Sequence, residues 1–249
     1  MPSITFTQST TTLVLLALIG LAAGLSRGFS GFGAALIFIP VAARLVGPKM
    51  ASAMLPLIDG ILTLPLIRPA WGVGSRRDVS LMVLGALLGI PTGTAVLALA
   101  EPLLLRWLIE GLALVMLLLL MSGWRYHGQP HAALTAGVGG ISGLFSGIAQ
   151  IGGPPVVAYW LGGQTPAATT RASIILFFAA GNVISIVSYA VGGLLTREVM
   201  LLALVAGPGY GIGIWIGNHL FGLASDVTFR RVALGLIALA IILGLPLWG

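Results

Sequence analysis

Glycine-rich interruptions occur at matching places in two long apolar segments of this chain. The first, Gly24–Gly33, reads GLSRGFSGFG, and the second, Gly143–Pro155, reads GLFSGIAQIGGPP. A shift of 119 residues superimposes five identities: Gly20 on Gly139, Gly24 on Gly143, Leu25 on Leu144, Gly28 on Gly147 and Gly33 on Gly152. Membrane helices broken at corresponding places in two halves of a chain are typical of transporter binding sites. The two segments are therefore the first candidates for a functional site.

The composition places the chain in a lipid bilayer. Hydrophobic residues make up 58% of it and charged residues only 7%, whereas a soluble domain carries about 25% charged residues. The net charge of +6 comes from basic residues at the ends of apolar runs, which fits the positive-inside rule and provides no basic face for a nucleic acid. We therefore expect a multi-pass protein of the cell inner membrane with no nucleic-acid partner.

Eight apolar runs approach or exceed the length of a membrane span. They are Leu13–Leu45, Ala51–Ile67, Val79–Leu99, Leu103–Ser122, Ala132–Leu161, Ala167–Val191, Val199–Leu220 and Val227–Trp248. The first has 33 residues and the fifth has 30, against about 20 that a bilayer requires. Both contain the glycine breaks, and we expect each half of a broken run to be too short to cross the bilayer alone.

Two topologies are compatible with these runs. If each broken run crosses once, eight crossings form two parallel repeats. If each turns back at its break, each repeat has a broken re-entrant helix hairpin plus three transmembrane helices, and the repeats are inverted. Arg27 lies inside a break and is left out of the comparison of charges. The inverted topology places seven of the other basic residues on one side of the membrane and four on the other. The parallel topology places five on one side and six on the other. The positive-inside rule favours inverted repeats, 1–124 and 131–249, joined by a loop at 125–130, with both termini outside.

Small residues also recur at four-residue spacing away from the breaks. Examples are Gly85, Gly89 and Gly93 in one run, and Gly213 and Gly217 in another. Faces of this kind let membrane helices approach closely. The contact can lie within the chain or between two copies of it, so the sequence is compatible with a homo-oligomer.

The breaks provide the groups that bind small anions. The second half-helix of each broken run starts with backbone N–H groups that lack intrahelical partners, at the positive end of the helix dipole. We expect both starts to meet at the bilayer midplane and to form one anion site. The expected residues are Ser30, Gly31, Phe32 and Gly33 from the first break, and Gln150, Ile151, Gly152, Gly153 and Pro154 from the second. Alternatively, the glycines serve only packing and kinks.

Three charged side chains are candidates beside this site. Arg27 lies inside the first break, where a charge costs at least ~2.5–3.5 kcal/mol on insertion scales, so it either pairs with Asp59 or contacts the anion. Asp59 lies mid-span and is a counter-ion, a proton carrier or a packing residue. Arg171 either binds the anion or extends to the interface. Asn182 and Ser185 line a polar path or form interhelical hydrogen bonds.

Catalytic and metal-binding patterns are absent from the sequence. The three histidines have no spacing that a helix would gather around a metal, and there is no cysteine. Ser30 and Ser146 are flanked by glycine but do not lie in Gly-x-Ser-x-Gly, and no His–Asp pair accompanies them. We therefore expect no enzyme activity, no metal and no cofactor.

The chain resembles the sulfite exporter TauE/SafE family. The resemblance rests on Gly28–Gly33 followed by Pro40, on Gly143–Pro155 and on Arg171-Ala-Ser. It implies transport of small sulfur-containing anions such as sulfite, sulfoacetate or related organosulfonates. We expect alternating access around the midplane site, with protons as one candidate coupling ion. The alternatives are a carrier for another small anion such as a carboxylate, an intramembrane enzyme and a non-transporting scaffold.

Overall fold

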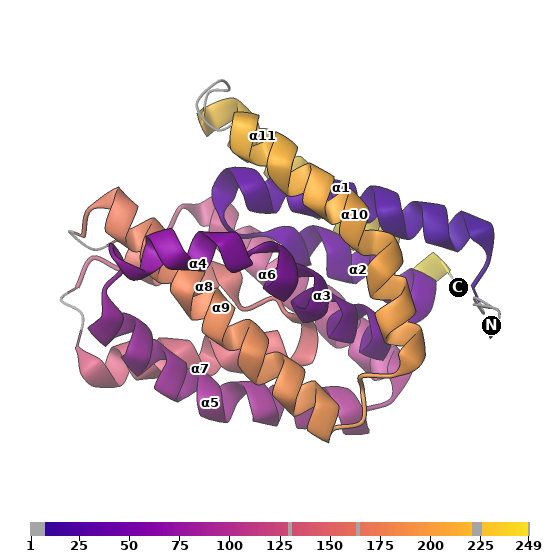
Figure 1. Ribbon diagram of the computed structural model, residues 1–249. Coiled ribbons are helices and arrows are strands. Elements are labelled where there is room, and N and C mark those ends of the chain that lie inside the picture. Colours follow the sequence, from indigo (N-terminus) through magenta and orange to yellow (C-terminus); the bar gives the residue numbers. More distant parts are fainter. Residues whose placement is uncertain (1–7, 129–130, 163–164, 221–225, 249) are drawn as a thin grey trace.

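The computed structural model describes residues 8–128, 131–162, 165–220 and 226–248. Within these ranges the protein is a bundle of α-helices without a β-strand, which confirms the predicted all-α class (Figure 1). The elements are α1 (Thr10–Ser30), α2 (Ala34–Val46), α3 (Pro48–Leu62), α4 (Leu64–Trp71), α5 (Arg76–Leu99), α6 (Pro102–Ser122), α7 (Ala132–Ala149), α8 (Gly153–Trp160), α9 (Ala167–Val191), α10 (Arg197–Leu220), α11 (Asp226–Gly244) and the 3₁₀ helix η1 (Pro246–Trp248).

Both predicted helix breaks are present, and they begin at equivalent residues. α1 ends before Gly31, which has φ 78°, and α7 ends before Gln150, which has φ 58°. These two residues are separated by the same 119 positions that align the glycine motifs. A residue in the left-handed conformation ends a helix because its N–H turns back to a carbonyl of the last turn. Gly31 N–H accordingly donates to the Arg27 carbonyl at 2.9 Å.

The first half of each broken run is long enough to cross a membrane. Among the described residues, six helices meet that criterion: α1, α5, α6, α7, α9 and α10. The expectation that each half is too short is therefore wrong for α1, with 21 residues, and α7, with 18. Each break lies at the C-terminal end of its glycine motif, which leaves short second halves, α2 with 13 residues and α8 with 8.

The run expected as a single span at Ala51–Ile67 is bent. α3 and α4 meet at Thr63 with an angle of 58° between them. Pro65 explains the bend, because proline has no N–H to donate to the carbonyl of Ile61 and its ring clashes with that group. Thr63 also donates its hydroxyl to the Asp59 carbonyl at 2.6 Å, an interaction that often accompanies helix bending.

Glycine faces hold two helix pairs together inside the chain. α1 packs along α10, and α5 packs along α7, on opposite sides of the bundle (Figure 1). A methyl group at Gly24 would collide with the Tyr210 carbonyl on α10, and one at Gly139 would collide with the Met82 carbonyl on α5. The partner glycines Gly85, Gly89 and Gly93 contact α7, and Gly213 and Gly217 contact α1. These faces are therefore intramolecular.

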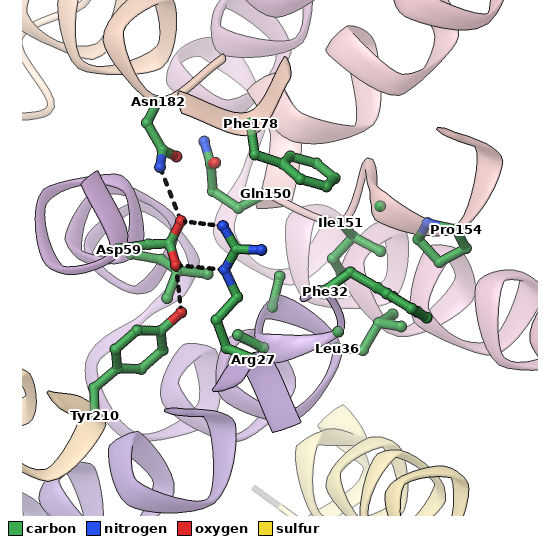
Figure 2. A pocket seen from close by; sticks show the side chains of 15 residues that line it. Arg27, Phe32, Leu36, Asp59, Gln150, Ile151, Pro154, Phe178, Asn182 and Tyr210 are labelled. Carbon is green, nitrogen blue, oxygen red and sulfur yellow. Dashed lines mark hydrogen bonds and ion pairs between the residues drawn. The ribbon is translucent and has the colours of Figure 1, made fainter. Parts of the chain in front are cut away.

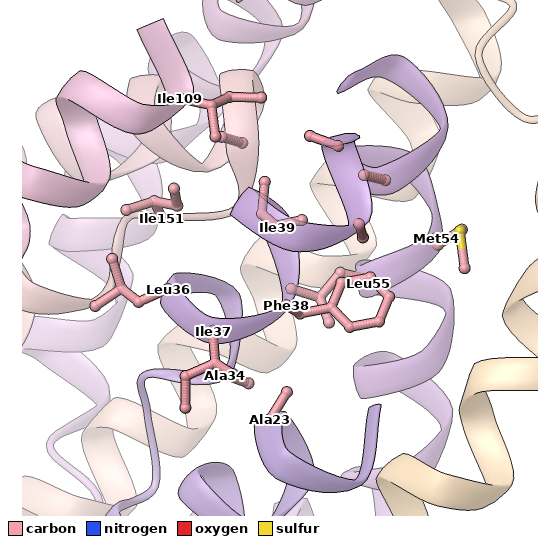
Figure 3. Close-up of a cluster of buried hydrophobic side chains, with 14 of the residues drawn as sticks. Ala23, Ala34, Leu36, Ile37, Phe38, Ile39, Met54, Leu55, Ile109 and Ile151 are labelled. Carbon is pink, nitrogen blue, oxygen red and sulfur yellow. The ribbon is translucent and has the colours of Figure 1, made fainter. Parts of the chain in front are cut away.

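α2 occupies the interior of the bundle. It packs against α1, α3, α6 and α11, and nine of its 13 residues are buried. A helix that is apolar on every side belongs in a protein core. The buried cluster joins α2 to Leu55 of α3, Ile109 of α6 and Ile151 of the second break (Figure 3). The start of α2 is thereby fixed beside the second break.

Replacing Gly139 by alanine should destabilise the protein by roughly 2 kcal/mol, because the new methyl group meets backbone that cannot move aside. The control is Gly137→Ala on the same helix. Apart from its own helix, no atom lies within 4 Å of the position of its new methyl group, so this change should raise stability by up to about 1 kcal/mol through helix propensity. Thermal unfolding in detergent should shift in opposite directions for the two variants. Equal shifts would contradict the proposed role of the glycine face.

Candidate functional site

One pocket brings the two helix breaks together. Its cavity has a volume of about 50 Å³. Its lining comprises Arg27, Phe32, Gly33, Ala34, Ala35, Leu36, Leu55, Asp59, Gln150, Ile151, Gly153, Pro154, Phe178, Asn182 and Tyr210 (Figure 2). The start of α2 and the start of α8 therefore line the same cavity. Two regions more than a hundred residues apart in sequence become one site.

An ion pair stands at one wall of this pocket. Arg27 Nε lies 2.8 Å from Asp59 Oδ1, and Arg27 Nη2 lies 3.2 Å from Oδ2. Both residues are 7% exposed. The contact is bidentate, the arrangement in which a guanidinium holds a carboxylate most firmly. Of the two partners considered for Arg27 from the sequence, the structure shows Asp59.

Two further donors complete the environment of the Asp59 carboxylate. Tyr210 donates its hydroxyl to Oδ1 at 2.7 Å, and Asn182 donates its amide to Oδ2 at 2.9 Å. Each carboxylate oxygen thus accepts one bond from Arg27 and one from another helix (Figure 2). Asp59 joins α1, α3, α9 and α10, and its charge is fully compensated in this conformation.

Arg27 also contacts the backbone of the first break and an aromatic ring of α9. Its Nη1 donates to the carbonyl of Gly31, and the Phe178 ring centre lies 5.6 Å from Cζ, within the range of a cation–π contact. The pair with Asp59 carries no net charge. Positive potential in the pocket therefore comes mainly from the backbone N–H groups at the helix starts.

The two helix starts are unequal as anion binders. At α2, no side chain caps Gly33, and N–H groups that lack α-helical partners continue through Ala34 and Ala35. At α8, the first turn contains Pro154 and Pro155, which have no N–H to donate. The residue types therefore place most donors on α2, and at α8 the pocket lining includes Gly153 but not Gly152.

The second break is held by a polar network around Gln150. Its side-chain amide donates to the Ser146 carbonyl at 2.9 Å and contacts the Tyr189 hydroxyl at 3.0 Å. Tyr189 also bonds to the carbonyls of Ser146 and Gly147, at 3.1 and 2.9 Å. A left-handed conformation costs a residue other than glycine about 1–3 kcal/mol. These bonds hold Gln150 in it.

Several expected site residues lie away from the cavity lining. Arg171 is exposed and does not line the pocket, because it stands seven residues before Phe178 on one continuous helix, about 10 Å along its axis. Gly152 packs against Ser142, whose hydroxyl donates to its carbonyl at 2.6 Å. Ser185 is fully buried, and its hydroxyl has no partner among the described residues. The Ser30 side chain lies outside the described part of the chain.

Two buried residues and one partly buried residue of note were not among the expected site residues. Phe178 and Tyr210 line the pocket, and Glu110 lies 3% exposed within α6. Phe178 follows Asp59 by 119 residues, so the repeat alignment could have pointed to it. Glu110 could have been found as an acidic residue inside the run Leu103–Ser122. Tyr210 has no comparable sequence signal, because aromatic residues are common in membrane helices.

The pocket lining is a mixture of hydrogen-bonding groups and apolar side chains. Among the described residues, no group of three His, Cys, Asp or Glu side chains is close enough to hold a metal ion. The cavity instead offers peptide N–H groups, two side-chain amides, one phenol and a neutral ion pair, surrounded by apolar side chains. This set of groups can bind a small anion and release it unchanged.

Comparison with known proteins assigns the chain to a family. The description of the family that matches is "Sulfite exporter TauE/SafE", and the match covers residues 16–244. The chain belongs to the sulfite exporter TauE/SafE family. The match includes both breaks and every residue of the pocket, and with the six apolar helices it indicates a multi-pass membrane protein of a transporter family. No curated protein and no solved structure matches the chain.

Removing Arg27 should destabilise this TauE/SafE protein strongly. Arg27→Ala leaves the Asp59 carboxylate buried without its cation, at a cost of about 3–5 kcal/mol. The double variant Arg27→Ala with Asp59→Asn should lose less, because no charge is stranded. Thermal unfolding in detergent measures the stability of both variants. The control is Arg68→Ala on the exposed face of α4, whose stability should lie within about 0.5 kcal/mol of wild type. A double variant no more stable than Arg27→Ala would contradict the role given to the pair.

Proposed function

We propose that this protein transports a small sulfur-containing anion, such as sulfite, sulfoacetate or a related organosulfonate, through the pocket at the two helix breaks. One observation carries the proposal: the N-terminal ends of α2 and α8 line the same pocket. Helix N-termini bind anions through free N–H groups and the helix dipole. Family membership supports the same substrate class.

The size and lining of the pocket favour a small anion. Its volume of about 50 Å³ has room for about four water-sized groups, comparable to one sulfur and three oxygen atoms. The sulfonate or sulfite oxygens would accept from the N–H groups of Gly33, Ala34 and Ala35. Apolar side chains, including Phe32 and Ile151, form much of the remaining wall. That wall can contact the carbon portion of an organosulfonate.

Alternating access requires two halves that move against each other, and the helix packing supplies a candidate arrangement. α1 and α5 belong to the first repeat, and each packs along a helix of the second repeat, α10 and α7 respectively. A shift of 119 residues relates α1 to α7 and α5 to α10, so the two contacts are equivalent. We propose that they are the surfaces over which two inverted repeats rock around the pocket.

A carrier for a carboxylate uses the same N–H groups and is the second candidate. Substrate identity is tested by thermal stabilisation of purified protein with sulfite, thiosulfate, sulfoacetate, taurine and acetate. A ligand at a hundred times its Kd stabilises the folded state by about 2.7 kcal/mol. We expect the sulfur anions to stabilise and acetate to have less effect. Preference for acetate would favour the carboxylate carrier, and no stabilisation by any anion would favour a scaffold.

Gly153→Val should weaken anion binding without unfolding the protein. A Cβ at Gly153 would lie at ordinary contact distances, 3.7 Å from Phe178 and 3.8 Å from Phe32, so the backbone there accepts a β-carbon, and the valine methyl groups would fill the space beside the helix start. We expect affinity to fall about tenfold or more, a loss of at least ~1.4 kcal/mol. Gly111→Val, on an exposed face of α6 with open space around it, is the control. Gly152→Val is unsuitable, because its side chain would collide with Ser142 and Ser146.

The inverted arrangement predicts that loop 125–130 and the C-terminus face opposite sides of the membrane. Three crossings in the second repeat separate them, and the charge distribution favours a cytoplasmic loop and an external terminus. Reporter insertions in the loop and at Gly249 measure both positions, and a separate reporter insertion at Gly123 checks the loop result. Reporters on the same side would indicate parallel repeats with eight crossings.

A further inference from the structure

Glu110 is a buried carboxylate outside the substrate pocket. It lies near the middle of α6 and is 3% exposed. Its Oε1 packs so closely against α11 that a Cβ atom added to Gly244 would collide with it. That added Cβ atom would also lie 2.8 Å from the carbonyl oxygen of Pro40 on α2. Glu110 is thus enclosed where α6, α2 and α11 meet.

The second oxygen of this carboxyl group has no partner. Oε2 of Glu110 is fully enclosed and forms no hydrogen bond with any described residue. Burying an ionised carboxylate without hydrogen bonds costs far more free energy than burying the protonated acid. The protonated acid carries no net charge, so it is enclosed there at a lower cost than the carboxylate. The surroundings therefore favour Glu110 with a proton bound.

Charged groups around Glu110 reduce this preference only in part. Arg106 precedes it by one helical turn on α6 and attracts its carboxylate. Arg44 on α2 donates to the Leu243 carbonyl at 2.9 Å, next to Gly244. The other charged or titratable residues in the helices packed against α6, or capping them, are Lys49, Asp59, His131, Tyr159, Asp226, Arg230 and Arg231. Lys49 donates to the Ala98 carbonyl and Asp59 is paired with Arg27.

Asp59 is poorly placed to carry a transported proton. Its carboxylate accepts four hydrogen bonds, two of them from Arg27. Protonating it would break the bidentate contact and strand the Arg27 charge in the core. The environment of Glu110 differs from that of Asp59, because no neighbouring group fully compensates the charge of its carboxylate. Binding a proton removes that charge.

We propose that Glu110 is a proton-binding site and that its proton couples transport to the pH gradient. Pro40, beside Glu110, and Leu36, in the pocket lining, are one helical turn apart on α2. Loss of the proton would leave a charge between α2 and α11, which favours a second conformation in which the carboxylate reaches water. The coupling step rests on the proposed transport function, whereas proton binding itself does not.

Proton binding is tested without substrate by infrared spectroscopy of the protein in lipid. Wild type at neutral pH should show the C=O stretch of a protonated carboxylic acid, and the band should vanish in Glu110→Gln, which keeps the side-chain shape. Glu101→Gln, at the exposed start of the same helix, should retain it. Absence of the band at neutral pH, or its survival in Glu110→Gln, would overturn the proposal.

Coupling is tested by uptake of radiolabelled sulfite into proteoliposomes with and without a pH gradient. Wild type and Glu101→Gln should respond to the gradient, and Glu110→Gln should transport at equal rates in both conditions. A full response in Glu110→Gln, or a wild type that transports but ignores the gradient, would refute the coupling role. Failure of wild type to transport any anion, with the infrared band present, would instead refute the proposed function and leave the proton site in place.

Discussion

A buried carboxylate joins the helices on which the rest of this structure depends. Asp59 accepts hydrogen bonds from Arg27, Tyr210 and Asn182, and these residues come from α1, α10 and α9. Leaving one buried charge of such a pair without its partner costs about 3–5 kcal/mol, so the four helices are held to a narrow range of relative positions. That restriction fixes the first break, because Arg27 also binds the carbonyl of Gly31 where α1 ends.

Interrupted helices place unpaired backbone N–H groups inside an apolar bundle, and here those groups face a cavity. A helix start buried in hydrocarbon would leave several N–H groups without acceptors, each at a cost of several kcal/mol. Here the starts of α2 and α8 open into a common cavity, where water or an anion can accept from them. The apolar surroundings of α2 keep this start in place, since nine of its residues are buried. Rigid packing and unpaired donors thus occur on the same short helix.

The two repeats share a backbone plan but contribute different chemistry to the pocket. The shift of 119 residues places Arg27 opposite Ser146 and Asp59 opposite Phe178. One repeat therefore supplies the ion pair, and the other supplies an aromatic ring that packs over the arginine. Asymmetry of this kind suits a site with a single substrate orientation. The charged groups of the pocket thus come from the first repeat, and the second repeat contributes neutral groups such as Gln150 and Ile151.

The sequence by itself determined the membrane environment, the all-helical class, the two broken runs and most of the pocket lining contributed by the breaks. These follow from local properties: apolar length, glycine content and the spacing of one motif relative to its copy. It left open whether Arg27 pairs with Asp59, and it gave no sign that Tyr210 would reach the same carboxylate. It also suggested Arg171 as a pocket residue and a straight span at Ala51–Ile67. Only the tertiary structure decided these points, because they depend on which faces of distant helices meet, and that is set by the glycine contacts between α1 and α10 and between α5 and α7.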